Sequence, residues 1–369
     1  MAYRMLTDPT MPRRAWAHLI VDEFQDAASI DAGIYYAASA ENRFYVGDPM
    51  QSIFAFRGAR AGIMSALASD APGWTRFELA ENWRSLPEVC KALTNLSRNA
   101  PSSAIKALQS FADTGGVVQA ARFQNDAAEA VSVASAVAGK VRENPDVAGE
   151  IAVLARTNAI ADRLAEALGN EGVSVRRLVP VEVPGDWKFA LSALEYLAAP
   201  TKRTMAAMFR RANERNWFAA RTDFEGLTGD ADKLESELRA LTVSEESIAM
   251  IKKRFDELPV SADLWDLSVD LALQPMGRVL QGEGVYVGTI HSAKGAEFDT
   301  VLLVGFEDEV IPGHSKKTDV EEERRVAFVG MSRAKRQLIV SWAERRAAPF
   351  GHGHHVEHAP SRFIAEAGL

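Results

Sequence analysis

Short β-rich runs alternate with helical stretches along most of this chain, and that alternation restricts the folds open to it. Strand-like runs rich in apolar and β-branched residues occupy residues 18–21, 43–46, 116–123, 151–154, 285–290, 301–304 and 338–342. Stretches with helical periodicity lie near residues 59–69, 86–99, 126–142, 158–169, 189–199 and 321–334. Because strands that alternate with helices form parallel sheets covered by helices, we expect an α/β fold.

Two of these helices begin with a recognisable capping pattern. Ser85 is followed three positions later by Glu88, and Asp319 by Glu322. A side-chain oxygen at the first position can accept a hydrogen bond from a free amide of the first helical turn. We therefore expect Ser85 and Asp319 to be the N-caps of the helices that follow them.

The composition is that of an ordinary soluble globular protein. The length of 369 residues predicts two or three domains, and the 47% hydrophobic and 25% charged residues exclude disordered and coiled-coil classes. No apolar run approaches the roughly 20 residues of a membrane span, and residues 1–4 lack the apolar core of a signal peptide, so we expect no membrane partner. The single cysteine, Cys90, cannot form an internal disulfide and fits a cytoplasmic location.

Two segments depart from the alternation. Between about 200 and 280 the strands vanish and charged residues interleave with Leu, Met and Trp, as in residues 233–239, which predicts a helical insertion. Near the end of the chain, the histidines within 352–355 lack Cys or carboxylates at ligand spacing. A solvated loop is therefore favoured there over a metal site.

Acidic residues follow the first two predicted strands. Asp22 and Glu23 come after the first, and Asp48 after the second. Parallel sheets bind ligands at the carboxyl ends of their strands. Adjacent acids at such an edge suit a nucleotide-hydrolysing enzyme, in which one carboxylate holds Mg²⁺ and the other deprotonates the attacking water. The ordinary alternative for Asp22 and Glu23 is a solvent-exposed strand end without a catalytic role.

The segment after Asp48 adds groups that can bind phosphates and bases. Gln51 can contact a phosphate through its amide, whereas Phe56 and Arg57 offer a stacking ring and a phosphate-pairing guanidinium. Phenylalanine side chains are more often part of a core, so core packing stays open for Phe54 and Phe56.

Three further segments carry candidate binding groups. Trp83 and Arg84 could bind a base and a phosphate together, although a half-buried Trp beside a surface Arg is the commoner arrangement. Residues 288–298 follow a strand and combine hydroxyls, a lysine and a glycine, as in a phosphate-cradling loop or an ordinary polar turn. In the helix near 321–334, one apolar face leaves Arg333 free to point into a cleft, and a salt-bridged surface helix is the alternative.

Taken in order, these segments resemble the motifs of superfamily 1 DNA helicases of the UvrD/Rep/PcrA type. VDEFQD resembles the Walker B motif of that family, GDPMQSIFAFRGA its motif III and NWRS its motif IV. TIHSAKGAEF resembles motif V and EEERRVAFVGMSRAK motif VI, and weaker matches lie at residues 153–158 and 360–364. The resemblance covers nearly the whole chain.

The resemblance implies RecA-like parallel sheets with flanking helices, of the P-loop NTPase helicase type. Residues 1–78 would be the C-terminal part of a first motor domain, which is therefore incomplete. Residues 79–199 and 281–369 would form the second motor domain, interrupted by a reduced helical insertion at 200–280.

The resemblance also implies an ATP-binding role for several side chains, with ATP and Mg²⁺ as cofactors. Asp22 would hold Mg²⁺, Glu23 would be the general base, and Gln51 would contact the γ-phosphate. Arg84 and Arg333 would be arginine fingers. The remaining nucleotide contacts would come from Trp83, which replaces the usual Tyr that stacks on adenine, and from Glu297 and Gly295 of motif V.

A DNA-binding role follows from the same comparison. Phe56 would stack against a base of single-stranded DNA, Arg57 would pair with a phosphate, and Thr289 and His291 would meet the DNA backbone. The formal net charge of −8 argues against coating of nucleic acid by charge alone, but a local basic groove stays open. The implied activity is that of an ATP-dependent 3′-to-5′ DNA helicase acting on single strands and single-strand/duplex junctions.

One departure from the family pattern is large. The sequence contains no GxxxxGK[ST] phosphate loop, since Gly139-Lys140 is followed by Val141 and Lys294 follows Ala293. Only residues 1–21 precede Asp22. We therefore expect an upstream or partner polypeptide to supply that loop. The alternative is a non-catalytic single-stranded DNA-binding or regulatory module that retains the helicase fold.

Overall fold

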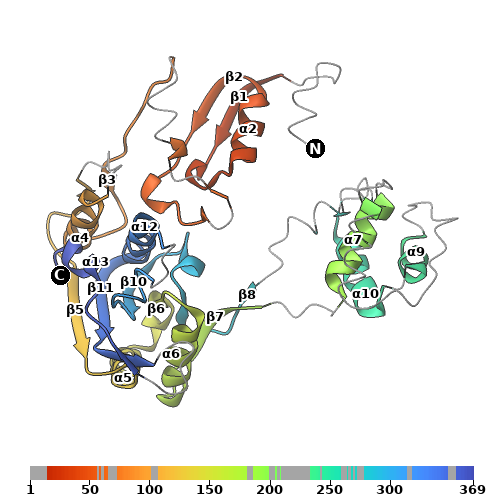
Figure 1. The fold of residues 1–369 in the computed structure, drawn as a ribbon. Coiled ribbons are helices and arrows are strands. Elements are labelled where there is room, and N and C mark those ends of the chain that lie inside the picture. The colour runs from red at the N-terminus through yellow and green to blue at the C-terminus, as the bar shows by residue number, and fades with distance from the viewer. Residues whose placement is uncertain are drawn as a thin grey trace. The chain divides into compact units, whose positions relative to one another are not determined.

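The computed structural model describes residues 15–55, 58–59, 62–64, 73–100, 107–180, 186–198, 204–205, 208, 233–241, 243–258, 264, 267–268, 271, 278–313, 318–347 and 355–369. Phe56, Arg57 and most of the helix expected near 59–69 lie outside these residues. The chain divides into two compact units (Figure 1), one formed by Met1–Arg177 with Gly282–Leu369 and the other by Leu178–Gln281. The domain boundaries expected at 78 and 199 stay predictions.

A seven-stranded sheet carries the first unit, in the order β5-β11-β10-β6-β9-β7-β8. Its strands are β5 Val117–Phe123, β6 Ile151–Ala155, β7 Val175–Pro180, β8 Arg278–Gln281, β9 Val285–Thr289, β10 Phe298–Val304 and β11 Ala334–Ala343. The pairs from β5 through β9 to β7 are all parallel. The α/β fold class predicted from the alternation is confirmed, whereas β7 and β8 were not predicted.

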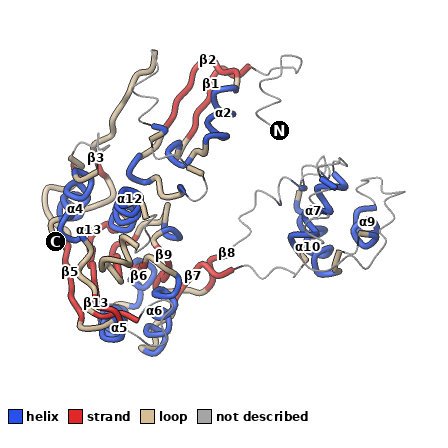
Figure 2. Tube along the Cα trace, viewed as in Figure 1, coloured by secondary structure: helices blue, strands red, loops and turns tan. Residues whose placement is uncertain are grey.

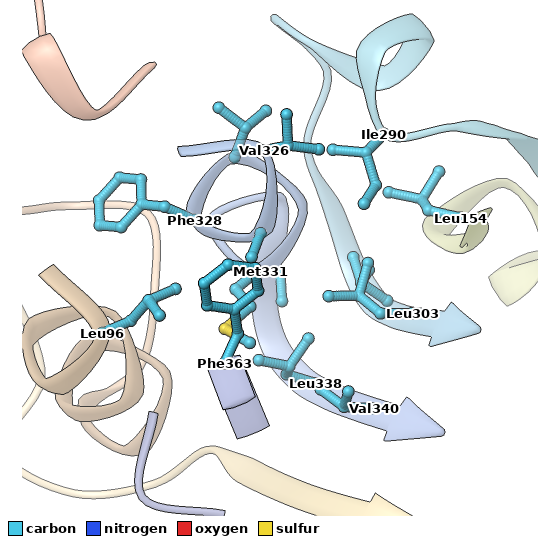
Figure 3. Packing of buried hydrophobic residues seen from close by; sticks show 14 of the residues in the cluster. Leu96, Leu154, Ile290, Leu303, Val326, Phe328, Met331, Leu338, Val340 and Phe363 are labelled. Carbon is cyan, nitrogen blue, oxygen red and sulfur yellow. The ribbon is translucent and has the colours of Figure 1, made fainter. Parts of the chain in front are cut away.

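Helices cover both faces of this sheet, and the alternation of strand residues decides which face each side chain joins. The helices are α4 Pro87–Arg98, α5 Asp126–Glu143, α6 Asn158–Asn170, α12 Val320–Met331 and α13 Arg362–Ala367. Leu154 of β6 and Leu303 of β10 belong to the cluster under α4, α12 and α13 (Figure 3). Their neighbours Val153 and Leu302 belong to the cluster under α5 and α6. Alternate residues thus form two cores, as a period of two requires.

One of the two predicted helix caps is present and the other is wrong. Asp319 caps α12, with its carboxylate accepting from Glu321 N at 2.9 Å. The N-cap of α4 is Leu86, without a side-chain hydrogen bond. Ser85 is fully buried, and its hydroxyl donates instead to the carbonyl of Ala334 at 2.7 Å. The hydroxyl therefore ties the start of α4 to the start of β11.

A separate two-stranded parallel sheet precedes this part of the chain. It pairs β1 Ala15–Val21 with β2 Ser39–Tyr45, and α2 Ser29–Ala37 connects them. Its small core includes Phe24, whose ring stacks on Tyr45 with centroids 4.6 Å apart, and Tyr45 stacks in turn on Trp74 at 5.2 Å. Much apolar surface stays exposed, including Ile20 at 71%.

The shorter elements complete the first unit. Two turns of 3₁₀ helix, η1 Phe24–Asp26 and η2 Pro49–Gln51, follow β1 and β2, and η6 His291–Ala293 follows β9. The remaining short elements are η4 Pro145–Glu150, the parallel pair β3 Glu81–Asn82 and β4 Gln109–Ser110, and the antiparallel pair β12 Arg345–Ala347 and β13 His355–Glu357.

Apart from β8 and the end of β7, which fall within its bounds, the second unit is mainly helical where the structure describes it (Figure 2). Its helices α7 Trp187–Ala198, α9 Leu234–Ala240 and α10 Glu245–Glu257 share one apolar cluster. The helix expected from residues 233–239 is thus present. Among the described residues, no helix is long and apolar enough to cross a membrane.

We expect the β1–β2 sheet to be the least stable part of the first unit when the chain is alone. Within the described residues β1 pairs only with β2, whereas β10 lies between two partner strands, so opening β1 breaks fewer contacts. Hydrogen exchange with mass spectrometry should show faster exchange for residues 15–21 than for 301–304. Equal protection of the two strands would contradict this prediction.

Candidate active site

The carboxyl ends of β1 and β2 bring the predicted acids together. Hydrogen bonds from Phe24 N to Val46 O and from Val46 N to Val21 O, both 2.8 Å, continue the pairing past the strands. Asp22 and Glu23 lie at this edge and are exposed, whereas their roles stay predictions. The acids that follow the two strands therefore lie at one edge of the sheet.

Gln25, to which the sequence analysis gave no role, links the two acidic segments. This buried side chain accepts from Asp48 N at 3.0 Å and donates to the Glu23 carboxylate. A Cβ at Gly47 would lie 2.3 Å from the Gln25 Oε1, so a larger residue there would displace the Gln25 amide. Glu23 itself has a left-handed backbone, with φ of 51°, a conformation that costs about 1–3 kcal/mol and concentrates at functional sites.

Asp48 orients the amide of Gln51. Its carboxylate accepts from Met50 N at 2.9 Å and from Gln51 Nε2 at 2.8 Å, and burial raises the pKa of this carboxyl. Because Nε2 of Gln51 is engaged, its Oε1 faces the other way and accepts from Arg333 Nη2 at 3.2 Å. Glu23 and Arg333 are thereby joined through Gln25, Asp48 and Gln51.

Arg333 is a buried cation with neutral hydrogen-bond partners. Only 2% of the residue is exposed. Within the described part of the chain, its guanidinium donates to Gln51 and to three other neutral oxygens, Val329 O, Ala296 O and Ser332 Oγ. Burial lowers its pKa to about 10, and the nearby charge of Arg84 acts in the same direction. Such a group would be stabilised by an anion beside it.

Arg84 lies near Arg333, is partly exposed and has an acidic partner. Its Nε donates to Glu297 at 2.6 Å, and Lys335 lies 3.1 Å from the same carboxylate. These two cations lower the pKa of Glu297. The turn that presents Arg84 is fixed by Asn82, whose side chain accepts from Arg84 N at 2.9 Å.

Trp83 points away from any core. Its residue is 75% exposed, and its indole donates to Glu81 at 3.2 Å. The half-buried alternative considered for this residue is therefore wrong.

Lys294 joins the η2 segment to the segment after β9. Its ammonium donates to the carboxylate of Asp26 and, at 2.8 Å, to Gln51 O, and it lies 4.8 Å from the centroid of Phe54. Arg325 of α12 adds a bond to Ser52 O at 2.8 Å. Sequence reasoning gave these residues no such role, because no local pattern reveals contacts made across so many positions.

Gly295 supplies the turn that follows Lys294. Its φ of +84° is a conformation that glycine adopts readily and other residues rarely do. The motif V loop therefore needs glycine at this position for its backbone path.

Thr289 and His291 lie at and just after the carboxyl end of β9, where Arg156, Glu323 and the backbone of Ile53 are near His291. Thr289 pairs with Ala155 at the carboxyl end of β9, whereas Glu297 and Arg333 immediately precede the amino ends of β10 and β11. The Thr289 hydroxyl accepts from Ser292 N at 3.2 Å. Phe56 and Arg57, expected to act with them, lie outside the described residues.

The acidic edge could bind Mg²⁺ only together with the phosphates of a nucleotide. No group of three or more His, Cys, Asp or Glu residues within the described ranges is arranged to hold a metal ion. Mg²⁺ is commonly held by one or two carboxylates together with substrate phosphates. The exposed carboxylates of Asp22 and Glu23 meet that requirement.

Comparison with known proteins places these features in a family. Residues 77–191 and 193–345 match the UvrD-like helicase C-terminal domain, and residues 9–72 match the UvrD/REP helicase N-terminal domain. A probable DNA helicase II homolog of Rickettsia conorii is 27% identical over 95% of this chain and 64% of that protein. DNA helicase II of Escherichia coli is 27% identical over 96% of this chain and 59% of that protein. The ATP-dependent DNA helicase UvrD2 of Mycobacterium tuberculosis is 26% identical over 94% of this chain and 49% of that protein. The chain thus spans less than two thirds of the length of these relatives.

The partly buried position of His291 predicts a pH-dependent stability. Burial lowers its pKa to about 4, and Arg156 and Lys294 act in the same direction, against the carboxylate of Glu323. Between pH 6.5 and 4 the unfolded chain binds a proton at this histidine that the folded chain does not, so stability falls as the pH decreases. Urea unfolding should show that the wild type loses about 2 kcal/mol more of its unfolding free energy between pH 7 and pH 5 than His291→Asn does. Identical losses would place this histidine in solvent.

Proposed function

Because the chain belongs to the UvrD-like helicase family, we propose that it contains the catalytic acids and arginine fingers of an ATP-dependent DNA helicase that moves 3′ to 5′ along single strands. The single observation that carries this proposal is the hydrogen-bonded connection from Glu23 to the buried Arg333. It joins a carboxylate edge, suited to water activation, to a cation that lacks a carboxylate hydrogen-bond partner among the described residues. The hydrolysis of a nucleoside triphosphate requires both a carboxylate that activates water and a cation that stabilises phosphate charge.

In this proposal each side chain has a distinct task. Glu23 orients the attacking water and takes its proton, and Asp22 holds Mg²⁺, which neutralises phosphate charge when bound. Gln51 senses the γ-phosphate, and its engaged amide keeps Arg333 directed at the same position. Arg333 and Arg84 stabilise the charge that develops on the transferred phosphoryl oxygens.

The two arginines would respond differently to nucleotide. Arg333 is fixed by four neutral acceptors, whereas Arg84 is partly exposed and bound to Glu297. An ion pair at such a site contributes little, so a triphosphate of higher charge can draw Arg84 away from the carboxylate. Glu297 would then face the nucleotide with Gly295, and Trp83 would stack on its adenine. Nucleotide binding would close the contact between the two sheets, and hydrolysis and release would open it again.

The DNA-binding part of the proposal rests on motifs III and V. Phe56 would stack on a base and Arg57 would pair with a phosphate of single-stranded DNA. Thr289 and His291 would contact the backbone at a position separate from the nucleotide. Since the pKa of His291 is lowered to about 4, it would donate a hydrogen bond as a neutral ring rather than as a cation.

We further propose that a polypeptide outside these 369 residues supplies the phosphate loop. The sequence has no GxxxxGK[ST], yet it keeps by type the proposed catalytic residues Glu23, Gln51, Arg84 and Arg333. The exposed apolar side chains of β1 and β2, such as Ile20 and Phe44, are a surface that an additional strand or helix could cover. The missing loop also supports a second candidate, a non-catalytic single-stranded DNA-binding or regulatory module.

ATP turnover distinguishes these two functions. We expect negligible DNA-stimulated ATPase from the chain alone, because arginine fingers accelerate hydrolysis only when the phosphates are already held. A polypeptide that carries the phosphate-loop segment of the family should restore turnover. Glu23→Gln and Arg333→Ala should abolish the restored activity, whereas Arg122→Ala, an exposed arginine paired with Glu344, should not.

The opposite outcomes are equally informative. Robust turnover by the lone chain would contradict the need for an added phosphate loop. No rescue by any complementing segment, with DNA binding intact, would favour the non-catalytic module.

Single-strand binding tests the assignment of motif III. We expect salt-sensitive binding to single strands in preference to duplex, because phosphate contacts release counterions and exposed bases can stack. Phe56→Ala should weaken single-strand affinity by roughly tenfold, as measured by fluorescence titration, since one base stack is worth about 1–3 kcal/mol. Unchanged affinity would contradict the DNA-stacking role of Phe56 and favour core packing for this residue.

A further inference from the structure

Phe111, a residue outside all the helicase motifs, lies beside Trp83. The β3–β4 pair sets Asn82 opposite Ser110, and Phe111 N continues the pairing with a bond to Asn82 O at 3.0 Å. The residues that follow the two strands are therefore neighbours. Their rings are within 13° of parallel, and their centroids are 6.3 Å apart.

Both rings keep most of their surface in solvent. Trp83 is 75% exposed and Phe111 51%. Aromatic pairs have centroids about 4.5–7 Å apart, so these rings touch only at the outer end of that range and bury little of each other. Large exposed apolar rings with parallel faces are what a planar base needs for stacking.

The charges around this ring pair fit a nucleotide. Arg84 directly follows Trp83, and Lys335 shares the carboxylate of Glu297 with it. The indole donates to Glu81, which fixes the plane of the Trp83 ring. An aromatic platform beside two cations, both paired with one exchangeable carboxylate, suits a ligand that has a base at one end and phosphates at the other.

We propose that Phe111 is a base-stacking residue, which forms with Trp83 a two-ring platform for the nucleobase of the bound nucleotide. This inference rests on the proposed nucleotide site and adds to it a second aromatic contact from β4. The two rings would stack on the face of the base whatever its identity. We therefore expect the site to bind a nucleotide more tightly than a polyphosphate that has no base.

Calorimetric titration with ATP and with inorganic tripolyphosphate tests this proposal, carried out on the full chain in complex with the polypeptide that supplies the phosphate loop. Tripolyphosphate carries the phosphates but no base. Phe111→Ala should weaken ATP binding about tenfold, as expected for the loss of one stacking contact, and leave tripolyphosphate binding unchanged. Phe111→Tyr should keep the affinity for ATP. Phe77→Ala is the matched control, because Phe77 is 76% exposed and belongs to neither ring of the pair.

Each other outcome overturns the inference and separates it from the proposed function. Unchanged ATP affinity in Phe111→Ala, with weaker binding in Trp83→Ala, would exclude Phe111 and keep the nucleotide site. Equal affinity of the wild type for both ligands would exclude a base platform and keep the phosphate site. Binding of neither ligand by the complex would remove the proposed nucleotide site together with this inference. If Phe111→Ala weakens only the binding of a deoxyadenosine oligonucleotide, the rings serve DNA instead.

Discussion

The hydrogen bond from the Arg333 guanidinium to Gln51 is the contact on which the rest of the site depends. It joins the segment after β2 to the segment before β11, and Asp48 holds the Gln51 amide in the only orientation that can make it. Gln25 and Glu23 continue the connection to the acidic edge. A buried polar group that loses its partner costs about 1–3 kcal/mol, so these side chains keep one another in place.

The two guanidinium groups of the site differ because Arg333 is buried and Arg84 is partly exposed. Arg333 is held in a low-dielectric environment that lowers its pKa to about 10, which means that its charge is costly until an anion arrives. Arg84 is neutralised by Glu297 near the surface, where exchanging one anionic partner for another costs little. The site therefore combines a preorganised cation with one that can rearrange, and Lys294 and Arg325 keep η2 close to both.

The sequence predicted the central sheet and its covering helices because periodicity reports burial directly, as Leu154 and Val153 on opposite faces of β6 illustrate. It predicted the acidic edge because strand ends are local features. The Ser85 cap failed because the hydroxyl found a carbonyl from β11, a partner far away in the sequence. Gln25 stayed without a role for the same reason, since only the fold brings Asp48 N to its side chain.

The rule that ligands bind at the carboxyl ends of parallel strands accounts for only half of the site. It locates Glu23, but Glu297 and Arg333 precede the amino ends of β10 and β11 and are joined there by the bond from Phe298 N to Arg333 O at 2.9 Å. When a ligand lies between two sheets, the second sheet is free to present its opposite edge, which no single-strand pattern reveals. Phe111 is harder still to find, because its position beside Trp83 comes from the register of two very short strands rather than from any motif.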